Sequence, residues 1–168
     1  MIHGFLKACT VSPALRVADC AFNTQQTIAA MQRAALDGAQ LAVFPELGLT
    51  GYTCGDLFFQ QPLQRAAAKG LAAVLEASAG LDLVALVGLP VAVDGKLYNC
   101  AAVVCHGKLL GLVPKTHLPN YGEFYEKRQF TPGSTEVQTV TVCGQQVPFG
   151  TSLLFRCRQT VSYTHLTL

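Results

Sequence analysis

The sequence has little charge. Only 13% of its 168 residues are Asp, Glu, Lys or Arg, whereas about 25% is typical of soluble domains. Hydrophobic residues make up 51% of the chain. This balance predicts strands that are buried on both faces, or contact with further protein. The length predicts one domain with a sizeable core.

Clusters of basic residues and long apolar runs are also missing. The net charge is +2, and Lys127-Arg128 is the only adjacent basic pair. Because a nucleic-acid-binding protein needs a basic patch, we exclude nucleic acid as a partner. No stretch reaches the roughly 18 apolar residues of a membrane span, and the N-terminus lacks a signal-peptide pattern. We therefore expect no membrane partner.

The cysteines show no metal-binding or disulfide pattern. They are odd in number and have no CxxC spacing. Several lie in apolar, strand-like runs, where a free cysteine behaves as a small hydrophobic residue. We expect no metal site, no disulfides and a reducing cytoplasmic location. The seven are Cys9, Cys20, Cys54, Cys100, Cys105, Cys143 and Cys157.

The first half of the chain has a strand–helix–strand pattern. Phe5–Ser12 predicts a strand, and Asp19–Leu36 has apolar residues at helical spacing, with Asp19 as the N-cap. Leu41–Phe44 is a short apolar run closed by Pro45, which is typical of a buried strand. This β-α-β order favours parallel strands.

The second half predicts a helix followed by antiparallel strands. Pro62–Ala79 is rich in alanine and helical in pattern. Tight turns at Asp94-Gly95 and His106-Gly107 would join three strands, namely Leu81–Pro90, Leu97–His106 and Lys108–Val113. Lys115–Gly133 is a long polar and aromatic loop, of a length that is usually functional. A last hairpin surrounds Gly144. The expected class is α/β.

Three charged residues lie at or after the predicted strand ends. Glu46 follows Pro45, Lys115 follows the apolar LLGLVP run, and Glu123 lies in the long loop. Strand ends are where α/β proteins place their chemistry. Two carboxylates and one ammonium group would perturb one another's protonation, as a proton-transfer site requires. Each residue alone is more often a solvated surface side chain, so only their joint placement favours a function.

Two long blocks resemble a known family. FPELGLTGYTCGDLFFQ resembles the first catalytic block of the nitrilase superfamily, the carbon–nitrogen hydrolases, and GLVPKTHLPNYGEFYEKRQFTPG resembles the second. These blocks and the later VPFGTSLLFRC resemble more specifically the glutaminase domain of glutamine-dependent NAD synthetases. The resemblance runs from about Phe5 to Arg158. It implies a nitrilase-type α-β-β-α sandwich, incomplete at the C-terminus.

The resemblance also implies site residues. Glu46 matches the general base, Lys115 the catalytic lysine, and Glu123 the second glutamate that positions both. Tyr121 matches a tyrosine that lines the glutamine pocket. In the family a cysteine thiol attacks the glutamine carboxamide, the glutamate moves the proton, and the lysine stabilises the oxyanion.

The nucleophile of this mechanism is missing from the sequence. In the family it lies after the LLFRC region, in a segment resembling EICEDLW, and nothing similar occurs here. Cys157 is the nearest cysteine but precedes that position, and we interpret Cys54, Cys100 and Cys105 as packing residues. We therefore expect an N-terminal fragment that is inactive alone. Residues 1–158 would be a partial glutaminase domain, and residues 159–168 a tail outside the family, similar to a translated library adapter.

The resemblance implies a longer parent enzyme. Its synthetase domain would bind ATP and Mg²⁺ and use the ammonia to amidate nicotinate adenine dinucleotide, so that the glutaminase domain needs no cofactor. We expect glutamine as the substrate, the missing C-terminal synthetase domain as a partner, and a homo-oligomer at full length. Two alternatives stay open: a stand-alone amidase or carbamoylase of the superfamily, and a non-catalytic binding remnant.

Overall fold

The computed structural model describes residues 5–156 and the strand at 163–165. Cys157 and most of the expected tail at 159–168 lie outside the described residues. The elements in chain order are β1 (Ala8–Thr10), α1 (Cys20–Leu36), β2 (Leu41–Val43), η1 (Gly55–Phe59), α2 (Gln61–Ser78), β3 (Val84–Val93), β4 (Lys96–Cys105), β5 (Lys108–Pro114), α3 (Glu126–Gln129), β6 (Gln138–Val142), β7 (Gln145–Phe149), β8 (Leu154–Arg156) and β9 (Tyr163–His165). The α/β class is therefore confirmed.

The main sheet has the strand order β1-β2-β3-β4-β5-β7-β6. β1, β2 and β3 are parallel, whereas β3, β4 and β5 form an antiparallel meander. β7 pairs with β5 in parallel and with β6 in antiparallel orientation. The expected β-α-β start and the meander are both confirmed. Both residues of each predicted hairpin turn, at 94–95 and 106–107, have positive φ, as a type I′ turn requires.

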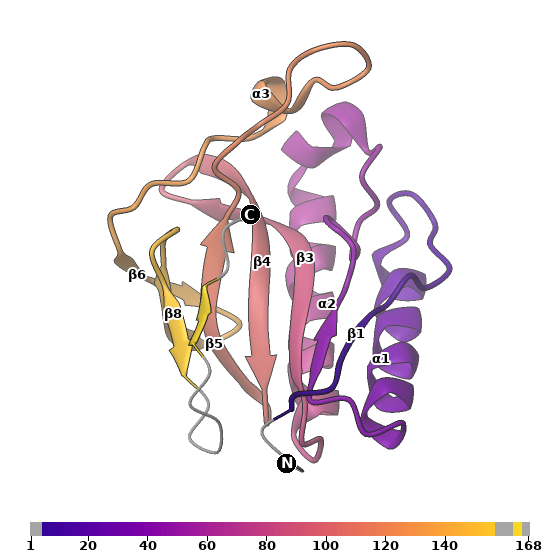
Figure 1. The fold of residues 1–168 in the computed structure, drawn as a ribbon. Coiled ribbons are helices and arrows are strands. Elements are labelled where there is room, and N and C mark those ends of the chain that lie inside the picture. The colour runs from indigo at the N-terminus through magenta and orange to yellow at the C-terminus, as the bar shows by residue number, and fades with distance from the viewer. Residues whose placement is uncertain (1–4, 157–162, 166–168) are drawn as a thin grey trace.

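Helices α1 and α2 cover one face of this sheet (Figure 1). Asp19 caps α1 as predicted, because its side chain accepts a hydrogen bond from the Phe22 N–H. The main core lies between these helices and alternate residues of the central strands, among them Val87, Leu89 and Ala102. The β8–β9 hairpin lies in front of β5, on the opposite face (Figure 1). That second face carries the site described below.

Two strands differ from their predicted bounds by three residues at one or both ends. β1 spans three residues, shorter than the predicted Phe5–Ser12. β3 runs through Pro90 to Val93, although a proline normally ends a strand inside a sheet. β2 pairs with β3 only as far as Leu86. Beyond Leu86, β3 pairs with β4, and its other side is an edge of the sheet in the described part of the chain. An edge position tolerates proline, which has no backbone N–H.

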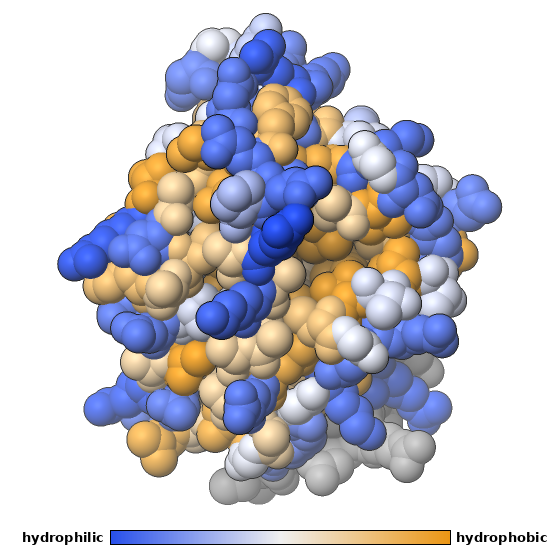
Figure 2. Space-filling model, turned by 180° about the vertical axis from the view of Figure 1, so that it is seen from behind, coloured by the Kyte–Doolittle hydropathy of each residue, from blue (hydrophilic) through white to orange (hydrophobic). Residues whose placement is uncertain are grey.

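Hydrophobic side chains are widespread across the middle of the face that is turned away from the viewer in Figure 1 (Figure 2). This agrees with the low charge and the high hydrophobic content of the sequence. In the part of the chain that the structure describes, no helix is both long enough and apolar enough to cross a membrane.

Candidate active site

Glu46 lies on a tight turn directly after β2. Leu47, the next residue, is fully buried and has a φ of +52°. The turn lies against Gly88 of β3: a Cβ at Gly88 would lie 2.5 Å from both the Pro45 carbonyl oxygen and the Leu47 nitrogen. The Leu49 N–H also donates to the Gly88 carbonyl at 3.1 Å. The sheet therefore fixes the backbone that carries Glu46.

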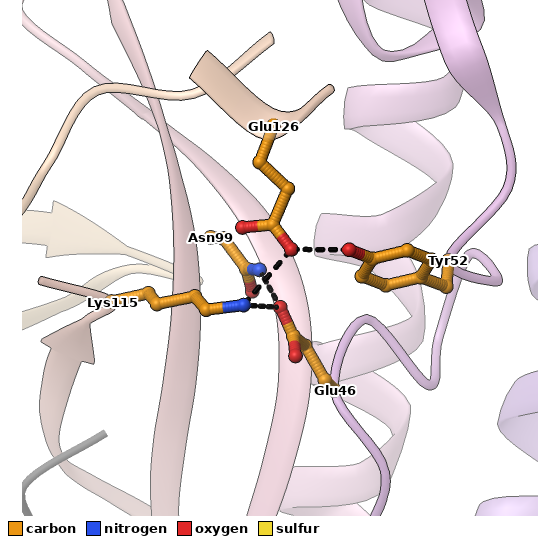
Figure 3. Close-up of polar contacts among 5 residues, drawn as sticks. All are labelled: Glu46, Tyr52, Asn99, Lys115 and Glu126. Atoms are coloured by element: carbon orange, nitrogen blue, oxygen red, sulfur yellow. Dashed lines mark hydrogen bonds and ion pairs between the residues drawn. The ribbon is translucent and has the colours of Figure 1, made fainter. Parts of the chain in front are cut away.

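Lys115 follows β5 and lies between two carboxylates (Figure 3). Its Nζ donates to Glu46 Oε1 at 2.7 Å and to Glu126 Oε1 at 2.9 Å. The exposed fractions of the side chains are 18% for Lys115, 39% for Glu46 and 5% for Glu126. The backbone N–H of Lys115 donates to the Asn99 carbonyl at 2.7 Å, which ties this residue to β4.

Two neutral side chains complete the site. Asn99 Nδ2 donates to Glu46 Oε1, and Tyr52 Oη donates to Glu126 Oε1 (Figure 3). We call Glu46, Tyr52, Asn99, Lys115 and Glu126 the polar cluster. Within this cluster both carboxylates use only their Oε1 atoms. Each carboxylate therefore keeps an Oε2 atom that makes no hydrogen bond to the cluster.

The electrostatics of the cluster keep Lys115 and Tyr52 protonated. Burial alone would lower the pKa of Lys115, but its hydrogen bonds and charge interactions with Glu46 and Glu126 raise it above the ordinary value. Burial raises the pKa of Tyr52 well above its usual range, and the hydrogen bond and charge of Glu126 add to this rise. At neutral pH, Lys115 is therefore a cation and Tyr52 a hydrogen-bond donor.

A cavity of about 290 Å³ opens beside Glu46, Asn99 and Lys115. Its other lining residues, which are mostly apolar, are Val43, Phe44, Leu86, Gly88, Cys100 and Ala101. An apolar pocket with a few converging polar groups is the usual form of a small-molecule site. Glu126 Oε2 is buried and has no hydrogen-bond partner among the described residues. A buried oxygen of this kind needs a donor.

A second set of contacts holds the loops that carry Tyr52 and Glu126. Arg128 Nε and Nη2 each lie 3.0 Å from a carboxylate oxygen of Asp56, so that the ion pair is bidentate. Phe58 of η1 packs against Phe130 with ring centroids 4.9 Å apart. We call Asp56, Arg128, Phe58 and Phe130 the loop brace. It joins η1 to α3 next to the polar cluster.

The structure brings Glu46 and Lys115 together, as the sequence predicted, but it does not bring Glu123 to them. Glu123 is exposed and, among the described residues, makes no hydrogen bond or ion pair. Glu126 occupies the place expected for it, because the single turn of α3 directs that residue inward while Lys127 and Arg128 stay exposed. In the sequence the signal is weak: Glu126 lies one helical turn before the apolar Phe130. The spacing of the charged residues alone did not reveal which glutamate points inward.

Three further expectations concern Tyr121, the cysteines and metal ions. Tyr121 is 72% exposed, packs on Phe124, and is not among the residues that line the cavity in the described chain.

Burial raises the pKa of Cys20 to about 11, and burial also raises the pKa of Cys54 and of Cys100. These thiols are therefore not activated. In residues 5–156 and 163–165, no group of three or more His, Cys, Asp or Glu side chains could hold a metal ion.

The chain matches known proteins over most of its length. A family model described as carbon-nitrogen hydrolase matches residues 7–153. A glutamine-dependent NAD(+) synthetase from Mycobacterium tuberculosis is 40% identical over 153 residues, which cover 91% of this chain and 22% of the relative. This chain therefore spans about a fifth of the length of that relative.

Solved structures give the same picture. A glutamine-dependent NAD(+) synthetase from Cytophaga hutchinsonii aligns with a TM-score of 0.84 at 26% identity, over 91% of this chain and 26% of that chain. A glutamine-dependent NAD+ synthetase from Acinetobacter baumannii, solved with ADP, aligns with a TM-score of 0.73 at 31% identity. That alignment covers 85% of this chain and 27% of the solved one. The expected nitrilase-type fold is thereby confirmed.

Proposed function

This chain belongs to the carbon–nitrogen hydrolase family, and we propose that its polar cluster serves the hydrolysis of the side-chain amide of glutamine. The observation that carries the proposal is the position of Lys115. Its ammonium group lies between two carboxylates at the edge of an apolar cavity. A cation held in this way can stabilise the oxyanion that forms when a nucleophile attacks an amide carbonyl.

The free atoms of the cluster suggest the other roles. Glu46 makes no cluster hydrogen bond through Oε2, so this oxygen is available to take a proton from a nucleophile and return it to departing ammonia. The ammonium group of Lys115 has three N–H groups, and two of them donate to Glu46 and Glu126. We assign the third N–H to the oxyanion. The buried Oε2 of Glu126 has no donor among the described residues, and we assign no role in proton transfer to it.

We propose that these groups act within a longer glutamine-dependent NAD synthetase. The Mycobacterium tuberculosis relative of that name is matched along 91% of this chain but only 22% of its own length. In such an enzyme the ammonia would amidate nicotinate adenine dinucleotide at a separate ATP- and Mg²⁺-dependent domain, and the full-length protein would form a homo-oligomer in the cytoplasm. Cys9, Cys20, Cys54, Cys100 and Cys143 are free thiols, which fits a reducing compartment.

We further propose that the 168-residue chain does not hydrolyse glutamine by itself. The family chemistry needs a thiolate beside the glutamate and the lysine. Cys100 is the cysteine that borders the cavity, but burial raises the pKa of its thiol far above neutral pH. The chain would therefore contribute the base and the lysine, while a cysteine elsewhere in the parent enzyme contributes the thiol.

The test compares the chain with a chimera in which it replaces the matching segment of the Mycobacterium tuberculosis relative. Ammonia release from glutamine is measured for both proteins. We expect the chimera to release ammonia and the isolated chain to release none. In the chimera, Glu46→Gln should reduce the release at least about 100-fold, because a general base is lost.

Ammonium chloride, supplied in place of glutamine, provides the control for folding. A Glu46→Gln chimera that still forms NAD from free ammonia is folded, so its loss of glutamine hydrolysis belongs to the cluster. Ammonia release by the isolated chain would contradict the proposed division of the site. Full glutamine hydrolysis by the folded Glu46→Gln chimera would contradict the role of the base.

A further inference from the structure

Asn99 makes a hydrogen bond to both Glu46 and Lys115. Its backbone carbonyl accepts the backbone N–H of Lys115 at 2.7 Å, and its side-chain Nδ2 donates to Glu46 Oε1. The residue belongs to β4 and is only 3% exposed. A single rigid strand position therefore holds both the backbone of Lys115 and the side chain of Glu46.

The side-chain contact fixes which oxygen of Glu46 Lys115 uses. Asn99 Nδ2 and Lys115 Nζ donate to the same atom, Oε1. Lysine alone is a weak guide, because its ammonium is a compact charge on a flexible stem. An amide N–H on a buried strand is directional and adds no charge. Together the two donors leave Glu46 Oε2 without a cluster partner.

Glu46 needs such a guide more than the other carboxylate does. Its side chain is 39% exposed and follows a turn, whereas that of Glu126 is 5% exposed. A partly exposed glutamate that is held by one lysine would lose little by rotating toward solvent. A second donor from the sheet opposes that rotation.

We propose that Asn99 is the positioning residue of Glu46, holding Oε1 on Lys115 so that Oε2 is presented to the cavity. The role in proton transfer rests on the proposed function, whereas the role in placing the carboxylate does not. Asn99 acts through Glu46. An apolar side chain cannot replace the amide of Asn99, because it has no hydrogen-bond donor. An ionised aspartate cannot replace it either, because a carboxylate only accepts hydrogen bonds.

The first test needs no catalytic activity. The side-chain pKa of Lys115 is measured by NMR titration in the full 168-residue chain, for the wild type, Asn99→Ala and Asn99→Leu, with Glu46→Gln as the reference. The groups that face Lys115 are Glu46 and Glu126, and Tyr52 donates to the same oxygen of Glu126. If Asn99 holds Glu46 in place, both Asn99 variants lower the pKa of Lys115 toward that of Glu46→Gln.

Two controls separate positioning from damage to the strand. Tyr98→Phe changes the neighbouring residue of β4, which packs on Phe149 in the core, and should leave the pKa of Lys115 unchanged. Asn99→Leu keeps the branching and the number of heavy atoms of the side chain, so it covers the case in which Asn99→Ala opens a hole. A pKa of Lys115 equal to the wild-type value in a folded Asn99 variant would overturn the proposal.

The second test uses the chimera described above. Asn99→Leu should lower kcat for glutamine about 10- to 100-fold with little change in KM, because a misplaced reacting group costs rate more than binding. An unchanged kcat would overturn the catalytic part of the proposal. If the wild-type chimera does not hydrolyse glutamine, the proposed function fails, and the titration of Lys115 still decides whether Asn99 positions Glu46.

Discussion

The two halves of the polar cluster are built in different ways. Glu46, Asn99 and Lys115 lie on, or directly after, strands of the main sheet, where the backbone is hydrogen-bonded on a buried scaffold. Tyr52 lies shortly before η1 and Glu126 begins the single turn α3, and the loop brace joins η1 to α3. The sheet half is therefore positioned by packing beneath it, and the loop half by contacts between two short elements. This difference predicts which substitutions damage the site and how severely.

Gly88→Ala should have the largest effect, because it acts on the sheet half. The added Cβ would lie 2.5 Å from two backbone atoms of the Glu46 turn. Backbone atoms cannot rotate away, so we expect a loss in unfolding free energy of about 4 kcal/mol or more, above the roughly 1–3 kcal/mol of ordinary overpacking. Chemical denaturation of the variant measures it. Gly80→Ala is the control, because nothing lies within 4 Å of a Cβ there. Equal stability of the two variants would contradict this account of the turn.

Phe58→Ala should have the next largest effect, on the loop half. Phe58 is 2% exposed and packs against Phe130. We expect a loss of about 3–4 kcal/mol, as for other buried phenylalanines that are replaced by alanine. The adjacent Phe59 is 49% exposed, so Phe59→Ala should change the denaturation midpoint very little. Similar midpoints for the two variants would show that η1 is not anchored through Phe58.

Alkaline pH should weaken the polar cluster through Tyr52 of the loop half and Lys115 of the sheet half. The pKa of Tyr52 is raised from 10.0, so above pH 10 the unfolded chain loses this proton before the folded chain does. The pKa of Lys115 is raised from 10.5, so its stabilisation is complete below that pH and is lost as the pH rises through the folded value. Stability should thus fall above pH 10, by at most about 1.4 kcal/mol per pH unit for Lys115. The fall due to Tyr52 should be smaller, because this residue is 36% exposed and solvent screens its interactions.

Tyr52→Phe tests this pH dependence, because phenylalanine cannot ionise. Denaturation midpoints measured between about pH 9 and pH 11.5 should fall less steeply for the variant than for the wild type. Tyr121→Phe controls for the loss of a hydroxyl outside the cluster, because Tyr121 is 72% exposed. Identical slopes for Tyr52→Phe and the wild type would contradict the assignment of this alkaline transition to Tyr52.

Asp56→Asn should have the smallest effect on stability, because both members of the Asp56–Arg128 pair are exposed. The expected change is local: faster hydrogen exchange at the Phe130 amide, which donates to the Glu126 carbonyl. Asp37→Asn breaks a comparable exposed pair with Arg33 on α1 and should leave that amide unchanged. Equal exchange rates in the two variants would mean that the pair does not hold α3.

The same comparison explains what the sequence could predict. Glu46 and Lys115 each follow an apolar run, and the chain direction at a strand end is set by the sheet, so their meeting was predictable. Asn99 was harder to recognise, because a polar residue inside an apolar strand shows its role only when its neighbours are known. In the long loop no periodic pattern exists, and one helical turn decides that Glu126 rather than Glu123 points inward.

The most direct test of this account compares Glu126→Gln with Glu123→Gln. The side-chain pKa of Lys115 is raised by Glu46 and Glu126, and an NMR titration of Lys115 reports which glutamates contribute. We predict that Glu126→Gln lowers the pKa of Lys115 while Glu123→Gln leaves it at the wild-type value. A drop with Glu123→Gln and none with Glu126→Gln would contradict the central claim, because Glu123 would then complete the cluster.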